Sequence, residues 1–128
     1  MIVYYEDRAH TETNLALKLE LYQFMQDNAL APEITTYAVA NVAGVDGVIR
    51  DLARTAIRAI AAQYGMQILL DWEGTLLAAP FSCVDEEANF VLIDRSGRIR
   101  YRHAGVIEGA ERTAMYRTLR HLIHEPRP

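Results

Sequence analysis

The single cysteine of the chain, Cys83, is the side chain best suited to nucleophilic chemistry. It lies in an irregular stretch, 81–88, while His10 follows the first apolar segment near the start of the chain. A redox thiol at Cys83 with His10 as a neighbouring base would be a cysteine–histidine pair, provided the fold brings them together. The preferred interpretation is plainer, because free cysteines are often small buried hydrophobic residues. A single cysteine excludes an intrachain disulfide and a cysteine-based zinc site.

A second group of residues could bind a metal ion. Glu6, Asp7 and Glu12 surround His10 within seven positions. Carboxylates and an imidazole can bind a divalent cation, but the spacing fits no metal motif, and the start of a helix repels cations. We therefore interpret the stretch as a polar capping loop and predict no metal and no cofactor.

Two further features could bind a partner. Arg98, Arg100 and Arg102 alternate with apolar or aromatic residues, which predicts that the three arginines share one face of a strand. Such a face could hold an anionic partner, although charges on an edge strand more often keep sheets from aggregating. Trp72, the only tryptophan, could anchor a partner or pack over the end of the sheet.

The periodicity of apolar residues predicts the elements that would position these side chains. A helix after the first strand would be capped by Thr11 or Thr13 and would bury Leu15, Leu19 and Tyr22, with Leu21, Phe24 and Met25 widening its apolar face. The next helix has the clearest apolar stripe, and Gly65 would end it. The last helix would turn Met115, Leu119, Leu122 and Ile123 inward. The expected order is strand 2–5, helix to about 28, strand 34–42, helix from 49 to 64, strand 66–70, a helical turn at 75–79, the hairpin 90–93 and 98–103, and helix 109–124.

The composition indicates one ordinary globular domain, residues 1–128, with 51% hydrophobic and 23% charged residues. A net charge of −4 argues against a general nucleic-acid binder. No apolar run approaches the roughly 18 residues that a membrane span needs, so no membrane association is expected. The first residues lack the features of a signal peptide, which predicts a cytoplasmic protein.

The order of these elements requires a parallel β-α-β-α-β unit followed by an antiparallel hairpin and a helix. With the segments Leu69-Leu70-Asp71-Trp72-Glu73-Gly74 and Phe90-Val91-Leu92-Ile93-Asp94-Arg95-Ser96-Gly97-Arg98-Ile99, the chain resembles the thioredoxin-like superfamily, in particular its redoxin and peroxiredoxin-like branch. The second segment is similar to the FLID-x-x-G-x-I hairpin of that branch. The resemblance implies an α/β three-layer sandwich, with a central mixed sheet and helices on both faces.

The resemblance also implies where an active site would lie, and this chain departs from it there. The two cysteines of the dithiol motif would fall near His10 and Thr13, and neither position is cysteine. The cis-proline that precedes the hairpin in this branch is replaced by Ala88-Asn89. A cis bond without proline costs about 2.5–4 kcal/mol, so we predict a trans bond there. The branch usually carries an additional hairpin before the strand at 2–5, which this sequence lacks.

We therefore predict a degenerate active site in a non-catalytic binding or regulatory module. An unknown protein or small-molecule ligand would occupy the vacated groove, at His10, Thr11, Thr13, Cys83, Ala88 and Asn89. One alternative is a single-cysteine peroxidase or thiol–disulfide protein that uses Cys83. Another is a structural homodimer or larger homo-oligomer, formed through the first strand or the arginine-bearing last strand.

Overall fold

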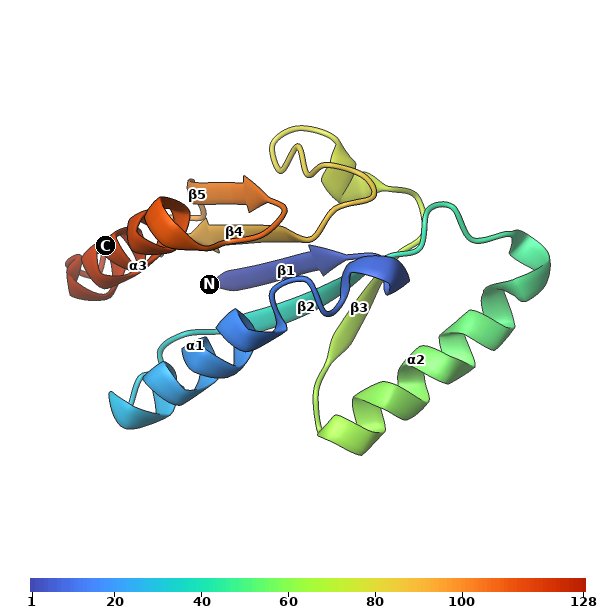
Figure 1. The fold of residues 1–128 in the computed structure, drawn as a ribbon, viewed down its shortest axis with the longest axis horizontal. Coiled ribbons are helices and arrows are strands. Elements are labelled where there is room, and N and C mark those ends of the chain that lie inside the picture. Colours follow the sequence, from blue (N-terminus) through green and yellow to red (C-terminus); the bar gives the residue numbers. More distant parts are fainter.

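The computed structural model describes residues 1–128, except for the side chain of Tyr64. The predicted order of elements is confirmed (Figure 1). Over these residues the α-helices and strands are β1 (Ile2–Glu6), α1 (Leu15–Asp27), β2 (Thr36–Asn41), α2 (Arg50–Tyr64), β3 (Ile68–Asp71), β4 (Asn89–Ile93), β5 (Ile99–Ala104) and α3 (Gly109–His124). Short 3₁₀ helices occupy η1 (Arg8–His10), η2 (Gly47–Ile49) and η3 (Thr75–Leu77).

The strands form one open mixed sheet in the order β3-β2-β1-β4-β5. β1 pairs in parallel with β2, and β2 in parallel with β3, while β4 is antiparallel to both β1 and β5. The fold is therefore α/β and is compatible with a three-layer sandwich. Because β4 pairs along the side of β1 that β2 leaves open, β1 is an interior strand. The prediction that the first strand could form a subunit interface is therefore wrong.

Two apolar clusters cover the two faces of the sheet. On one face, α1 and α3 pack over Ile2, Phe90 and Leu92, with Met115 and Leu119 of α3 fully covered. The opposite face holds a smaller cluster, which η3 and the segment after it cover: Val3, Tyr5, Val39, Cys83, Val91 and Ile93, flanked by Leu76, Leu77 and Phe81. The inward face predicted for α3 is confirmed.

The predicted inward face of α1 is confirmed for Leu21, Phe24 and Met25 but wrong for its other three residues. Leu15, Leu19 and Tyr22 are exposed, whereas Leu17 and Leu21 are buried against the sheet together with Met25. This helix has apolar residues on both sides, and their spacing alone does not say which side meets the sheet. The outcome depends on the neighbouring helix, since Phe24 packs on Tyr116 of α3 with ring centroids 5.8 Å apart.

The arginines of the last strand do not share a face. A bulge between Leu92 and Ile93 shifts the register, so that Ile99 pairs with Ile93 but Tyr101 pairs with Leu92. Arg100 then turns to Asp94 and Glu125, at 3.1 and 2.8 Å, while Arg102 donates to the Phe81 carbonyl at 2.6 Å. The predicted arginine row is therefore wrong, because the pattern of two on which it rests is broken inside the strand.

In the part of the chain that the structure describes, no helix combines the length and apolar character needed to cross a membrane.

Candidate functional site

The candidate site lies where β1 ends, at an edge that we call the loop end of the sheet, formed by segments 6–14, 84–89 and 104–107. Asn89, the first residue of β4, holds two of these segments together and is only 2% exposed. Its side-chain oxygen accepts from the Val84 amide at 2.8 Å. Its amide nitrogen lies within hydrogen-bonding distance of three carbonyls, those of Val84, Glu87 and Tyr5, at 2.9, 3.1 and 3.2 Å. Asn89 therefore fixes 84–87 against the end of β1.

Asn14 joins the third segment to the other two. It stands at the position before α1, where its buried side chain donates to the Gly105 carbonyl at 3.0 Å and accepts from the Ile107 amide at 2.9 Å. The Gly105 amide in turn donates to the Ala88 carbonyl at 2.8 Å. The predicted capping role of Thr11 or Thr13 is wrong, because Asn14 takes the cap position and uses its side chain for long-range bonds.

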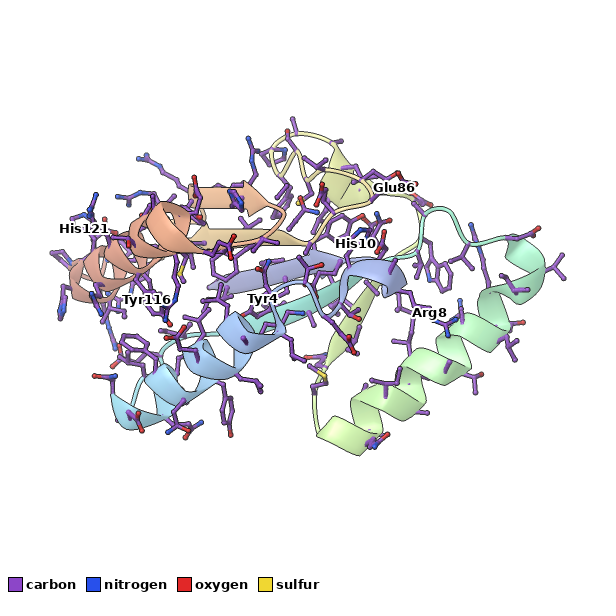
Figure 2. The ribbon with its side chains drawn as sticks, in the orientation of Figure 1. Tyr4, Arg8, His10, Glu86, Tyr116 and His121 are labelled. Carbon is purple, nitrogen blue, oxygen red and sulfur yellow. The ribbon has the colours of Figure 1, made fainter. Side chains whose placement is uncertain are left out.

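His10 is paired with Asp7 through η1. Asp7 caps this turn by accepting from the His10 amide at 3.0 Å, and the same carboxylate oxygen lies 2.6 Å from the imidazole Nδ1. This bond, reinforced by the negative charges of Asp7, Glu87 and Glu86, raises the pKa of His10 against a smaller opposing effect of desolvation. The pair leaves the imidazole Nε2 for an outside partner, and the segments of His10 and Glu86 lie at the same end of the sheet (Figure 2).

Cys83 lies below this surface, in the cluster on the opposite face of the sheet, and is 6% exposed. Burial raises the pKa of its thiol to about 11, although the nearby charge of Arg102 opposes the shift. The described contacts of His10 and Cys83 do not include one another. The structure therefore places the predicted cysteine as a core residue and does not bring the nucleophile and base together.

The remaining predicted residues are at the loop end. Thr11 is exposed and Thr13 half-buried, in the turns between η1 and α1. Ala88 is buried beside Asn89, and their peptide bond is trans, because the cis bond among the described residues is Ala79–Pro80. The structure thus gathers His10, Thr11, Thr13, Ala88 and Asn89 at one edge of the sheet.

Two buried polar contacts went unnoticed in the sequence. Tyr5 donates to Asp71 at 2.8 Å, and Asp71 also accepts from the Thr75 and Leu76 amides at 2.9 and 3.0 Å. Burial would raise the pKa of Asp71, but these amides and the tyrosine hydroxyl outweigh it and lower the pKa. The bonds to Thr75 and Leu76 make Asp71 part of the turn after β3, while its bond to Tyr5 carries no local signal, since 66 residues separate them.

Glu6 is the second such contact. Its carboxylate contacts the Lys18 ammonium, which also donates to the Thr11 carbonyl at 2.9 Å and lies 5.3 Å from the Tyr4 ring centroid. Burial raises the pKa of Glu6, against the lowering effect of Lys18. This ion pair ties α1 to the end of β1, so Glu6 is a structural residue. Among the described residues, no group of three or more acidic, histidine or cysteine side chains could hold a metal ion.

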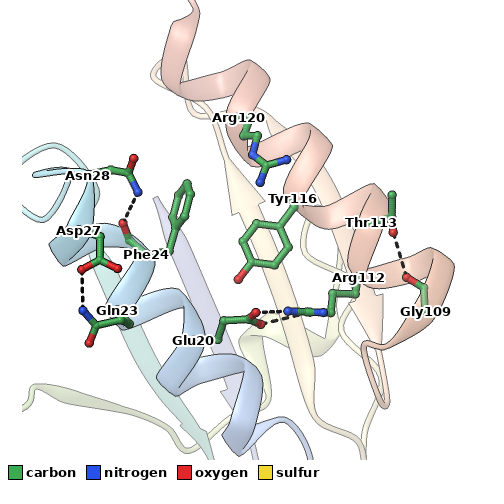
Figure 3. A pocket seen from close by; sticks show the side chains of 10 residues that line it. All are labelled: Glu20, Gln23, Phe24, Asp27, Asn28, Gly109, Arg112, Thr113, Tyr116 and Arg120. Atoms are coloured by element: carbon green, nitrogen blue, oxygen red, sulfur yellow. Dashed lines mark hydrogen bonds and ion pairs between the residues drawn. The ribbon is translucent and has the colours of Figure 1, made fainter.

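An open groove of about 740 Å³ runs between α1 and α3 (Figure 3). Its α3 wall carries Arg112, Tyr116 and Arg120, with each guanidinium 5.7 Å from the tyrosine ring centroid. Its α1 wall carries Glu20, which forms a two-point ion pair with Arg112 across the groove. The three α3 residues are four positions apart, a spacing that places them on one side of a helix. Nothing in the sequence indicates that α1 lies opposite this side.

No family model, curated protein or solved structure matches the chain.

Proposed function

We propose that this chain is a thioredoxin-like domain without the redox dithiol, and that it serves as a binding module with the loop end of the sheet as its binding surface. The order of elements and the hairpin of β4 and β5 support the fold assignment. His10 and Thr13 stand where the resemblance implies cysteines. The partner is a basic peptide segment of another protein.

The state of Cys83 is the observation that most favours binding over catalysis. A thiol with a pKa of about 11 is ionised in only about one molecule in 10⁴ at pH 7, and the thiolate is the reactive form. The sulfur is also enclosed by apolar side chains of the sheet. A single-cysteine peroxidase needs the opposite arrangement, an exposed thiol beside a positive charge or a base.

The charge of the loop end favours a cationic partner. The electrostatic potential at His10 is negative, because the charges of Asp7, Glu86 and Glu87 each raise the pKa of its imidazole. Asn89 and Asn14 hold the backbone beneath these side chains in one conformation, so little ordering entropy is lost on binding.

The binding proposal can be tested with a tetra-arginine peptide as the probe, followed by backbone amide chemical shifts at low salt. We expect shifts confined to 6–14 and 84–89, and at least a several-fold weaker affinity in the double variant Glu86→Gln/Glu87→Gln. The matched control is Asp27→Asn/Glu33→Gln, which removes the same charge from exposed positions elsewhere. Equal weakening in both double variants would mean general attraction to an acidic protein and would overturn the proposal.

Turnover assays separate this function from the redox alternative. Wild-type protein and Cys83→Ser are expected to be equally inactive with hydrogen peroxide and with a small aromatic disulfide. Turnover that disappears in Cys83→Ser would instead establish the thiol enzyme.

A further inference from the structure

One side of α2 carries several large apolar side chains that no other element covers. We define the α2 stripe as six uncharged residues that lie on this side of α2 and in the η2 turn before it. The exposed fraction of its four large members is 89% for Val48, 74% for Leu52, 50% for Ile49 and 47% for Ile60. The members are Val48, Ile49, Leu52, Ala56, Ala59 and Ile60.

The other sides of α2 show that the helix is held with this stripe outward. The half-buried side chains Ala53, Ile57 and Ala61 lie on a different side from the stripe. The guanidiniums of Arg50 and Arg54 stack over the Trp72 ring, 5.2 and 5.5 Å from its centroid. Figure 1 shows α2 extending away from α1 and α3. In this orientation both arginine contacts form, and the stripe is left exposed.

We propose that the α2 stripe is the contact between two copies of this chain, paired antiparallel about a two-fold axis near Ala56. Ile49, Leu52, Ala56 and Ala59 are spaced three, four and three residues apart, the spacing of residues that interlock between paired helices. The small side chains at 56 and 59 let the backbones approach closely. An antiparallel arrangement then sets Leu52 of one copy against Ala59 and Ile60 of the other.

Charge and area both fit a second copy. The stripe contains no ionisable side chain, so two identical surfaces meet without like-charge repulsion. Taking about 170 Å² for a fully exposed large aliphatic side chain, the four large members present about 450 Å² per copy, so a pair would bury on the order of 900 Å² before the alanines and the polar rim are added. That total is below the roughly 1,200 Å² at which specific interfaces begin, so Ala56, Ala59 and the polar residues beside the stripe have to contribute the remainder.

The first experiment measures the mass of the wild-type protein by light scattering over a range of concentrations. We expect twice the chain mass of 14.5 kDa at high concentration, and monomer for Leu52→Glu with an unchanged circular dichroism spectrum. Leu19→Glu is the matched control, because Leu19 is an exposed leucine of α1 outside the stripe, and it should remain dimeric. A wild-type monomer at about 1 mM, or a dimer that survives Leu52→Glu, would overturn the proposal.

A crosslinking experiment tests the axis itself. In a Cys83→Ser background, Ala56→Cys should oxidise rapidly to a covalent dimer, because a two-fold axis brings the two copies of residue 56 within disulfide distance. Arg58→Cys, on another side of α2, should crosslink at least tenfold more slowly. Equal rates would reject the antiparallel pairing.

A third measurement distinguishes a lipid surface, which an apolar helix face also fits. Wild-type protein that stays monomeric but sediments with phosphatidylglycerol vesicles, in a manner lost in Leu52→Glu, would replace the dimer by a membrane contact. None of these experiments depends on the loop end, so their outcomes are separable from those for the proposed function.

Discussion

Replacing Asn89 by alanine should destabilise the protein far more than the small change in side-chain size suggests. The substitution removes the acceptor of the Val84 amide and the donor to the carbonyls of Val84, Glu87 and Tyr5. A buried polar group left without a partner costs about 1–3 kcal/mol. Residues 84–86 are exposed, so their freed groups can turn to water, while the Tyr5 carbonyl cannot. We therefore expect a loss of about 2–4 kcal/mol in the free energy of unfolding.

Urea unfolding followed by circular dichroism measures this loss, and Asn28→Ala serves as the control. Asn28 also donates a side-chain hydrogen bond, to the Phe24 carbonyl at 2.8 Å, but at an exposed helix end where the expected cost is below about 1 kcal/mol. In Asn89→Ala the amide hydrogen of Val84 should in addition exchange with solvent much faster. A loss no larger than that of Asn28→Ala would show that the loop end is not held by Asn89.

Three further predictions concern titratable groups. Native Cys83 should react with a chromogenic disulfide at least about 100-fold more slowly at pH 8 than in urea, since its pKa of about 11 suppresses the thiolate; comparable rates would contradict its burial. The pKa of His10 should lie above about 6.5 by NMR titration and fall in Asp7→Asn, so that its contribution to stability is present below that pH and lost as the pH rises through the folded value. The lowered pKa of Asp71 stabilises the fold above about pH 3.9, and this contribution is lost as the pH falls through the folded value. Asp71→Asn should therefore flatten the urea midpoint between pH 5 and 2, and a profile parallel to wild type would reject this effect.

Local signals were sufficient for most elements of the fold. The hairpin follows from an apolar run, a polar turn with glycine and a second alternating run, and the structure has β4 and β5 at these positions. α3 spans the predicted residues, and Gly65 ends α2 in the left-handed conformation with φ of 60°. In each case the deciding interaction lies within a few residues of sequence.

Features that depend on tertiary contacts could not be predicted from the sequence. The buried side of α1 depends on where α3 packs, and the interior position of β1 depends on the return of β4 to its free side. The bulge that separates Arg100 from Arg102 could not be predicted, because β5 contains no glycine or other turn residue at that point. The amphipathic pattern of α2 identified a helix but could not indicate that Ile49, Leu52 and Ile60 would remain exposed.

The site was predicted in part for a similar reason. His10 follows the end of β1 and Asn89 begins the antiparallel strand β4, so the order and direction of the strands place both residues at the same edge. The bond from Asn89 to Tyr5 spans 84 residues, and the two bonds of Asn14 to Gly105 and Ile107 span 91 and 93. At such separations the spacing of residues in the sequence gives no information on contacts. The preference for Cys83 as a core residue rested on the general burial of free cysteines, and the structure places it among apolar side chains.

The two proposed surfaces are compatible in one molecule because of the direction of α2. The strands β1, β2 and β3 are parallel and end at the same edge, where Asn41 of β2 donates to Asp85 at 2.8 Å, so α2 begins at the loop end and runs away from it. An antiparallel α2 pair would therefore set the two loop ends at opposite ends of a helix of 15 residues, about 22 Å long. Both acidic surfaces would stay open, and a dimer could hold two basic segments of one partner at once. Two such segments joined by a flexible linker should then bind more tightly than either alone, and this gain should disappear in Leu52→Glu while single-segment binding is retained.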